Sequence, residues 1–94
     1  MVIVSFADKR TELIWLREPT KRISLELQRL AHRKMLVLNR VVRIDELRIP
    51  PGNNLKTLSG DRAGQHSIRV NDQWRLCFIW TNAGIEAVEL VDYH

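Results

Sequence analysis

The stretch "GDRAGQHSIRVNDQWRLCFIW", residues 60–80, decides the fold because it holds two strand-like segments joined by a short polar turn. A two-residue loop would pair Ile68 with Arg75 and mix apolar and charged side chains on one sheet face. A three-residue loop at residues 71–73 pairs Ile68 with Leu76 and makes that face almost wholly apolar. A half-buried sheet requires such a face, so we predict the three-residue loop.

The same register places Arg69 opposite Arg75 on the other face, beside Ser67 and Cys77. Like charges directly opposite each other are unfavourable. In one interpretation, Glu89 on the last strand neutralises one of the arginines. In the other, the pair awaits an anion such as a phosphate, which a guanidinium grips through two parallel hydrogen bonds. We expect Arg75 to be an exposed polar position.

Composition is that of an ordinary globular protein, with 45% hydrophobic and 28% charged residues among 94. We expect one domain over residues 1–94. The chain has no apolar run of about 18 residues and no signal-peptide pattern. Cys77 is the only cysteine and the three histidines are scattered, so we expect a cytoplasmic protein without disulfide, metal or cofactor.

Turn signals and apolar periodicity predict an α+β fold, in which an N-terminal strand and two helices precede a twisted antiparallel sheet. The expected elements are a strand at 2–6, helices at 8–17 and 21–43, a helical turn at 45–48, and strands at 54–58, 66–70, 74–80 and 85–93.

The longer helix is predicted to be amphipathic. Its expected apolar stripe is Ile23, Leu27, Leu30, Ala31, Met35, Leu38 and Val42. Its opposite face carries Arg22, Arg29, Arg33 and Arg40. The excess of Lys and Arg over Asp and Glu lies in residues 1–48, which include this helix. The arginines are consistent with a solvated face, with contact to the ribosome or other nucleic acid, or with partner docking.

The last strand runs into Asp92, Tyr93 and His94. RNA cleavage without a metal needs a base for the 2′-hydroxyl, cations around the phosphate and an acid for the leaving 5′-oxygen. Histidine titrates near working pH and suits the acid–base steps. The residues that one concave sheet face could gather for these tasks are Lys56, Arg69, Arg75, Asp92, Tyr93 and His94.

Three ordered motifs extend this interpretation: "L-x-x-L-x-G-D-R-x-G", "S-I-R-V-N-x-x-W-R-x-x-F" and "D-Y-H". With their spacing, the chain resembles the HigB toxins of bacterial type II toxin–antitoxin systems, which are part of the RelE/ParE superfamily. The resemblance covers essentially the whole chain and implies a RelE-like fold.

The resemblance implies a ribosome-dependent mRNA endonuclease that cuts the codon in the A site and so inhibits translation and growth. It also implies a HigA-like helix-turn-helix antitoxin, with operator DNA bound only through the antitoxin complex. An alternative on the same scaffold is a non-catalytic toxin that inhibits DNA gyrase, as ParE relatives do. A repressor is disfavoured, because the chain shows no helix-turn-helix pattern of its own.

Carried over to this sequence, the family motif makes Arg75 the clamp on the phosphate. His94 becomes the leading acid or base, with Asp92 as a second acid or base or as its orienting partner. Tyr93 stacks on a base or donates to the phosphate.

Two further positions concern RNA contact. Lys56 stands where some relatives carry histidine, and would stabilise a phosphate as a point charge. Arg62, in "GDR", either contacts RNA or pairs with Asp61, and Arg69 is a second expected RNA contact.

Overall fold

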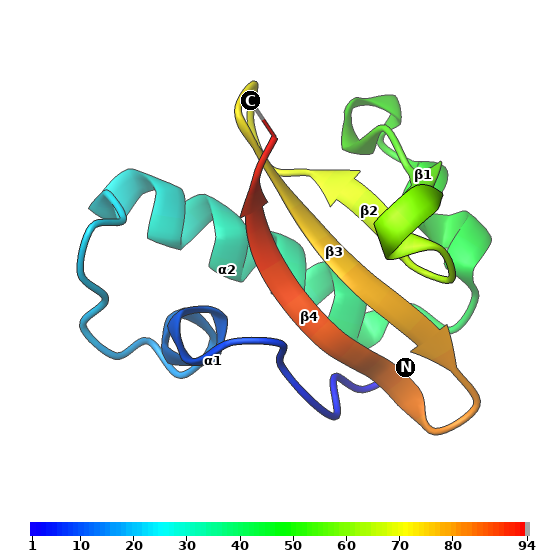
Figure 1. Cartoon of the computed structure of the whole chain (residues 1–94), viewed down its shortest axis with the longest axis horizontal. Helices are drawn as coiled ribbons and strands as arrows, with labels where there is room; N and C mark the ends of the chain where they lie inside the picture. Colours follow the sequence, from blue (N-terminus) through cyan, green and yellow to red (C-terminus); the bar gives the residue numbers. More distant parts are fainter. Residues whose placement is uncertain (94) are drawn as a thin grey trace.

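The computed structural model describes residues 1–93. Two helices are followed by a four-stranded antiparallel sheet, which confirms the expected α+β fold (Figure 1). The elements are α1 (Lys9–Trp15), α2 (Leu25–Arg40), β1 (Lys56–Thr57), β2 (His66–Arg69), β3 (Trp74–Thr81), β4 (Gly84–Asp92) and the short 3-10 helices η1 (Ile44–Arg48), η2 (Pro51–Asn53) and η3 (Gly60–Arg62). The strands lie side by side in the order β1-β2-β3-β4.

The β2–β3 hairpin has the predicted register. Ile68 pairs with Leu76, and Arg69 pairs with Arg75. The turn is held by the side chain of Asn71, whose Oδ1 accepts hydrogen bonds from the backbone N–H groups of Gln73 and Trp74. An asparagine that bonds the backbone ahead of it favours a tight turn, which fixes this register.

Both helices begin at a capping side chain. Asp8 accepts a hydrogen bond from the Thr11 backbone at 2.8 Å, and Ser24 accepts one from Leu27 at 3.1 Å. The prediction that the long helix starts at residue 21 and ends at 43 was wrong at both ends. Ser24 supplies the N-terminal cap, and beyond Arg40 the backbone becomes extended. Val42 is therefore 73% exposed and lies outside the apolar stripe.

The N-terminal segment is not a regular strand, contrary to expectation. It meets β4 through isolated parallel bridges, Ile3 with Ile85 and Phe6 with Val88. Between them Ala87 adopts a left-handed φ of 53°, and its backbone N–H is bonded by the Ser5 hydroxyl. This irregularity in β4 interrupts the ladder, so the segment follows the edge without joining it continuously.

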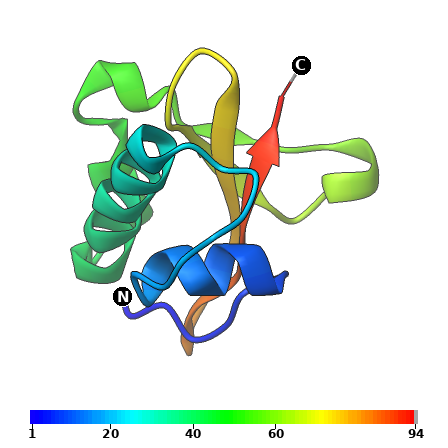
Figure 2. The ribbon, with the colours of Figure 1, turned by 90° about the vertical axis from the view of Figure 1, so that its left-hand side faces the viewer.

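The first strand of the sheet is shorter than the predicted 54–58. Within this range only Lys56 and Thr57 pair with β2. The left-handed Asn54, with φ 50°, precedes the strand, and η3 begins soon after it at Gly60. The chain between β1 and β2 therefore leaves the plane of the sheet. In Figure 2 it projects on the side opposite α2.

The core lies between the sheet and the helices. α1 packs against α2 and against β4, where the Thr11 hydroxyl accepts from the Leu90 backbone N–H at 3.0 Å. The buried core includes Met35 and Leu38 from α2 together with Leu76 and Phe78 from β3. We call the opposite side of the sheet, turned away from α2, the front face. No helix in residues 1–93 is long and apolar enough to cross a membrane.

Candidate active site

Arg75 is the centre of the front face. Its Nε donates to the Ser67 hydroxyl at 2.9 Å, and its Nη2 donates to the Asn54 carbonyl at 2.5 Å and the Ser67 carbonyl at 3.3 Å. Within residues 1–93, Nη1 has no hydrogen-bond partner and no carboxylate forms an ion pair with the guanidinium. Two nitrogens are thus held in place and one is available to a ligand.

The expectation that Arg75 is an exposed position was wrong. Its residue is only 6% exposed, and its neighbours Ser67 and Cys77 are fully buried. Asn54, which lies between η2 and β1, accepts a hydrogen bond from the guanidinium with its backbone carbonyl. Burial lowers the pKa of Arg75, because a cation loses hydration there. An arginine stays charged nonetheless, so this site favours an anion.

Tyr93 covers part of Arg75. The centre of its ring lies 5.7 Å from the guanidinium carbon, within the range of a cation–π contact. Tyr93 is itself 45% exposed. One part of the ring therefore packs on the arginine, while the rest is open to a ligand such as an RNA base.

Glu89 does not neutralise either of the paired arginines, as one of the two interpretations had it. It pairs with Arg62 at 3.1 Å, and neither Arg69 nor Arg75 forms an ion pair with it. The pairing of Arg62 with Asp61, one of the two alternatives for this arginine, is not formed. The ion pair raises the pKa of Arg62. Arg62 lies in η3, and this short helix places its side chain beside Glu89. Glu89 therefore pairs with Arg62 and not with an arginine of β2 or β3.

Arg69 and Lys56 complete the cations of the front face. Arg69 forms an ion pair with Asp72 of the turn. Lys56 lies opposite Ser67 in the β1–β2 register, so it shares the face of Arg75, and it is exposed. The front face therefore carries the buried Arg75 and three further cations, Lys56, Arg62 and Arg69, each from a different element.

Asp92 is placed differently from Tyr93. It lies opposite Trp74, whose neighbours in β3 alternate between the two faces, so Asp92 points to the helix side. Its carboxylate accepts a hydrogen bond from the Gln73 side chain at 3.0 Å. His94 lies outside the described residues. Of the two described residues of the terminal motif, Tyr93 is the one in contact with Arg75.

Ser67 and Asn54 were missed as site residues in the sequence. The register already placed Ser67 on the face of Arg75, diagonally across the hairpin, and a hydroxyl there is a usable signal for a hydrogen bond. Asn54 contributes only its backbone carbonyl. A contact with a backbone carbonyl depends on the path of the chain, and because every residue has this carbonyl, the residue type does not predict the contact.

Other reactive groups have structural surroundings. Burial raises the pKa of the Cys77 thiol, which disfavours a nucleophilic thiolate. His66 packs against Phe78, with ring centres 6.0 Å apart. Within the described part of the chain, no three His, Cys, Asp or Glu side chains gather as metal ligands.

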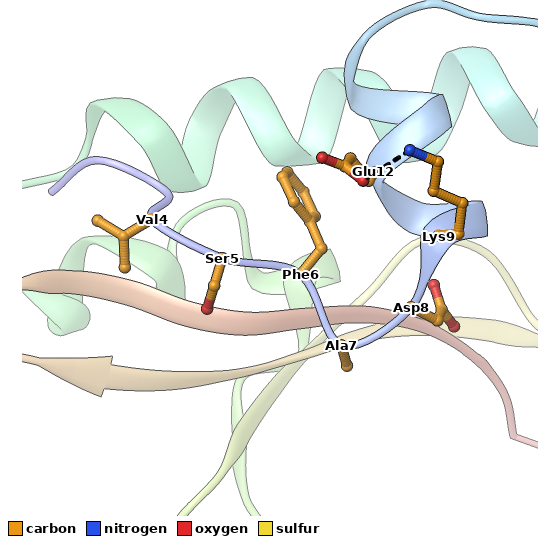
Figure 3. Close-up of a pocket in the computed structure, with 7 residues that line it drawn as sticks. All are labelled: Val4, Ser5, Phe6, Ala7, Asp8, Lys9 and Glu12. Carbon is orange, nitrogen blue, oxygen red and sulfur yellow. Dashed lines mark hydrogen bonds and ion pairs between the residues drawn. The ribbon is translucent and has the colours of Figure 1, made fainter.

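A hollow of about 470 Å³ lies elsewhere, along the N-terminal segment and the start of α1 (Figure 3). It is lined by Val4, Ser5, Phe6, Ala7, Asp8, Lys9 and Glu12. Lys9 and Glu12 form an ion pair beside it at 3.3 Å. None of the residues that line this hollow belongs to the front face around Arg75, so the front face remains the candidate site.

Comparison with known proteins agrees with this arrangement. Residues 4–94 match the family model described as the RelE-like toxin of the type II toxin–antitoxin system HigB. The chain is 35% identical over 92 residues to Toxin HigB-1 of Vibrio cholerae serotype O1, with 97% of this chain and 96% of that protein covered. The chain therefore belongs to the HigB-like toxin family of type II toxin–antitoxin systems.

Proposed function

We propose that this toxin is a ribosome-dependent endoribonuclease that cleaves mRNA in the A site and thereby stops translation. The observation that carries the proposal is the buried guanidinium of Arg75, which has hydrogen-bond partners but no carboxylate partner in residues 1–93. A phosphodiester supplies the missing negative charge. Family membership supports the same activity, and ribosomes place that activity in the cytoplasm.

The proposed reaction needs no metal. The 2′-oxygen loses its proton to a base and attacks the adjacent phosphorus, and the bond to the 5′-oxygen breaks as that oxygen gains a proton from an acid. Negative charge builds on the phosphate oxygens in the transition state. Arg75 is fixed by Ser67 and Asn54, so it meets this charge without reorganisation.

The other front-face residues have supporting roles in this proposal. Lys56, Arg62 and Arg69 attract and position the RNA backbone, and Tyr93 stacks on an exposed base. His94 is the leading acid or base, and it follows directly after Tyr93 in the chain. Asp92 is the last residue of β4, and its proposed role is that of a second acid or base or of the residue that orients His94.

The protein partners in the proposal are the ribosome and a HigA-like helix-turn-helix antitoxin. The antitoxin brings the toxin to operator DNA, because the nine residues between α1 and α2 exceed the turn of about three or four residues in a helix-turn-helix.

Primer extension on a defined mRNA tests the activity. Purified toxin is added to a reconstituted translation reaction with ribosomes present or omitted. We expect new 3′ ends only when ribosomes are present. Intact mRNA in both reactions, with folded toxin, would contradict the proposal, and a DNA supercoiling assay would then test the gyrase alternative.

A further inference from the structure

The outer face of α2, turned away from the core, carries exposed arginines. Arg29, Arg33 and Arg40 follow each other at steps of four and seven, which places them on one stripe of the helix. All three are exposed. Within residues 1–93, none of them forms an ion pair with a carboxylate. The stripe therefore attracts a negatively charged partner.

Two leucines lie on the same stripe. Leu25 is 61% exposed and Leu36 is 45% exposed. They stand four residues before and seven residues after Arg29, so they are interspersed among the arginines along the helix. Burial of these leucines against apolar side chains of a protein partner would stabilise a complex, whereas a phosphate backbone offers no apolar surface to bury them. The leucines therefore favour a protein over RNA.

A hollow adjoins this stripe where α1 meets the start of α2. Its volume is about 180 Å³, and its lining is Ile14, Arg17, Leu25, Gln28 and Arg29. Ile14 is buried, with 2% exposure, and provides an apolar wall. Two arginines stand beside this apolar wall. The hollow is suited to one apolar side chain whose neighbours in the partner are carboxylates.

We propose that the outer face of α2 is the docking surface for an acidic, amphipathic helix of the antitoxin. One apolar side chain of that helix enters the hollow beside Ile14, a second covers Leu36, and flanking Asp or Glu residues pair with Arg29 and Arg33. Helix-on-helix packing of this kind reads apolar anchors at steps of three and four. The inference goes beyond RNA cleavage and does not depend on it.

Binding of purified antitoxin tests this proposal without ribosome or mRNA. Isothermal titration is carried out with wild-type toxin and with the double variant Arg29→Glu/Arg33→Glu. We expect the dissociation constant to rise by about tenfold or more, because two attractive contacts become repulsive. The matched control is Lys9→Glu/Arg48→Glu, which makes the same charge change at exposed sites on α1 and η1 and is expected to change affinity less than about threefold.

The apolar part of the surface is tested in the same way. Leu36→Ala is expected to weaken antitoxin binding by about fivefold, while Ile49→Ala, at an apolar site off α2 that is even more exposed than Leu36, has little effect. Wild-type affinity in both α2 variants, with the fold intact by circular dichroism, would overturn the proposal. Unchanged antitoxin binding with weakened binding of an A-form RNA duplex would overturn it as well and assign the stripe to RNA.

Discussion

The front face and the outer face of α2 use arginine in opposite ways. Arg75 is 6% exposed and donates three hydrogen bonds to neighbouring protein groups. Arg29 and Arg33 are exposed, and within the described residues they have no ion-pair partner. A buried, bonded guanidinium offers fixed geometry, which chemistry requires. Exposed guanidiniums offer charge at little structural cost, which suits docking.

The largest expected effect is that of Arg75→Ala. It removes the proposed phosphate clamp and should abolish mRNA cleavage. It also leaves the Ser67 hydroxyl and the Asn54 carbonyl without their donor, so the free energy of unfolding should fall by about 1–3 kcal/mol. Urea unfolding and primer extension measure the two effects.

The matched control for that prediction is Arg33→Ala, which is expected to change the free energy of unfolding by less than about 0.5 kcal/mol. Equal urea midpoints for the two variants would remove the contrast between buried and exposed arginines. Cleavage by Arg75→Ala is assayed in the absence of urea, where the variant is folded, so that a loss of activity is not caused by unfolding.

Tyr93 sharpens the comparison because it touches Arg75 and yet is half exposed. Tyr93→Ala should reduce cleavage by tenfold or more, since stacking of a base on an aromatic ring contributes about 1–3 kcal/mol. Tyr93→Phe keeps the ring and should retain most activity. Single-turnover cleavage rates measure both variants. A rate for Tyr93→Phe as low as that of Tyr93→Ala would assign the role to the hydroxyl instead.

The ion pair between Arg62 and Glu89 should matter less for stability. Both side chains are about one third exposed, at 31% and 29%, so solvent screens their attraction. Glu89→Gln is expected to lower the free energy of unfolding by less than about 1 kcal/mol, and less still in high salt. A double-mutant cycle with Arg62→Gln isolates this pair. A coupling energy several times larger would mean that the pair is effectively buried.

The smallest effect concerns two histidines. Burial lowers the pKa of His66 and of His32 from the ordinary 6.5, and the charge of Arg17 adds to the effect at His32. The folded state thus binds their protons less readily than the unfolded state. The contribution of these histidines to the free energy of unfolding should be fully present above pH 6.5. It should decrease as the pH falls from 6.5 through their lower folded-state pKa values. Urea midpoints at pH 7.5 and pH 5.5 measure this change. The variant His32→Gln/His66→Gln should show a flatter dependence.

The hairpin register could be predicted because alternation leaves little choice. Shifting the pairing by one residue would move Leu76 to the other face and Arg75 to the core. The order of helices and strands could also be predicted, since local turn signals and apolar periodicity decide it. The family resemblance, carried by motifs within residues 55–94, was confirmed over nearly the whole chain.

The burial of Arg75 and the partner of Glu89 could not be predicted. Alternation tells which face a side chain points to, but not what covers that face. The left-handed Asn54, just before β1, places its carbonyl against Arg75, and after β1 the helix η3 brings Arg62 to Glu89. The short contact of the N-terminal segment with β4 was missed for a similar reason, because the left-handed Ala87 has no sequence signal.

Single-turnover cleavage of ribosome-bound mRNA by Tyr93→Ala and by Arg29→Glu/Arg33→Glu, run in parallel, tests the division between the two faces most directly. The front face is predicted to carry the chemistry, so Tyr93→Ala should cut at least about tenfold more slowly. The α2 variant should cut at close to the wild-type rate. Equal losses in both variants would contradict the account, because α2 would then contact the ribosome or mRNA during cleavage.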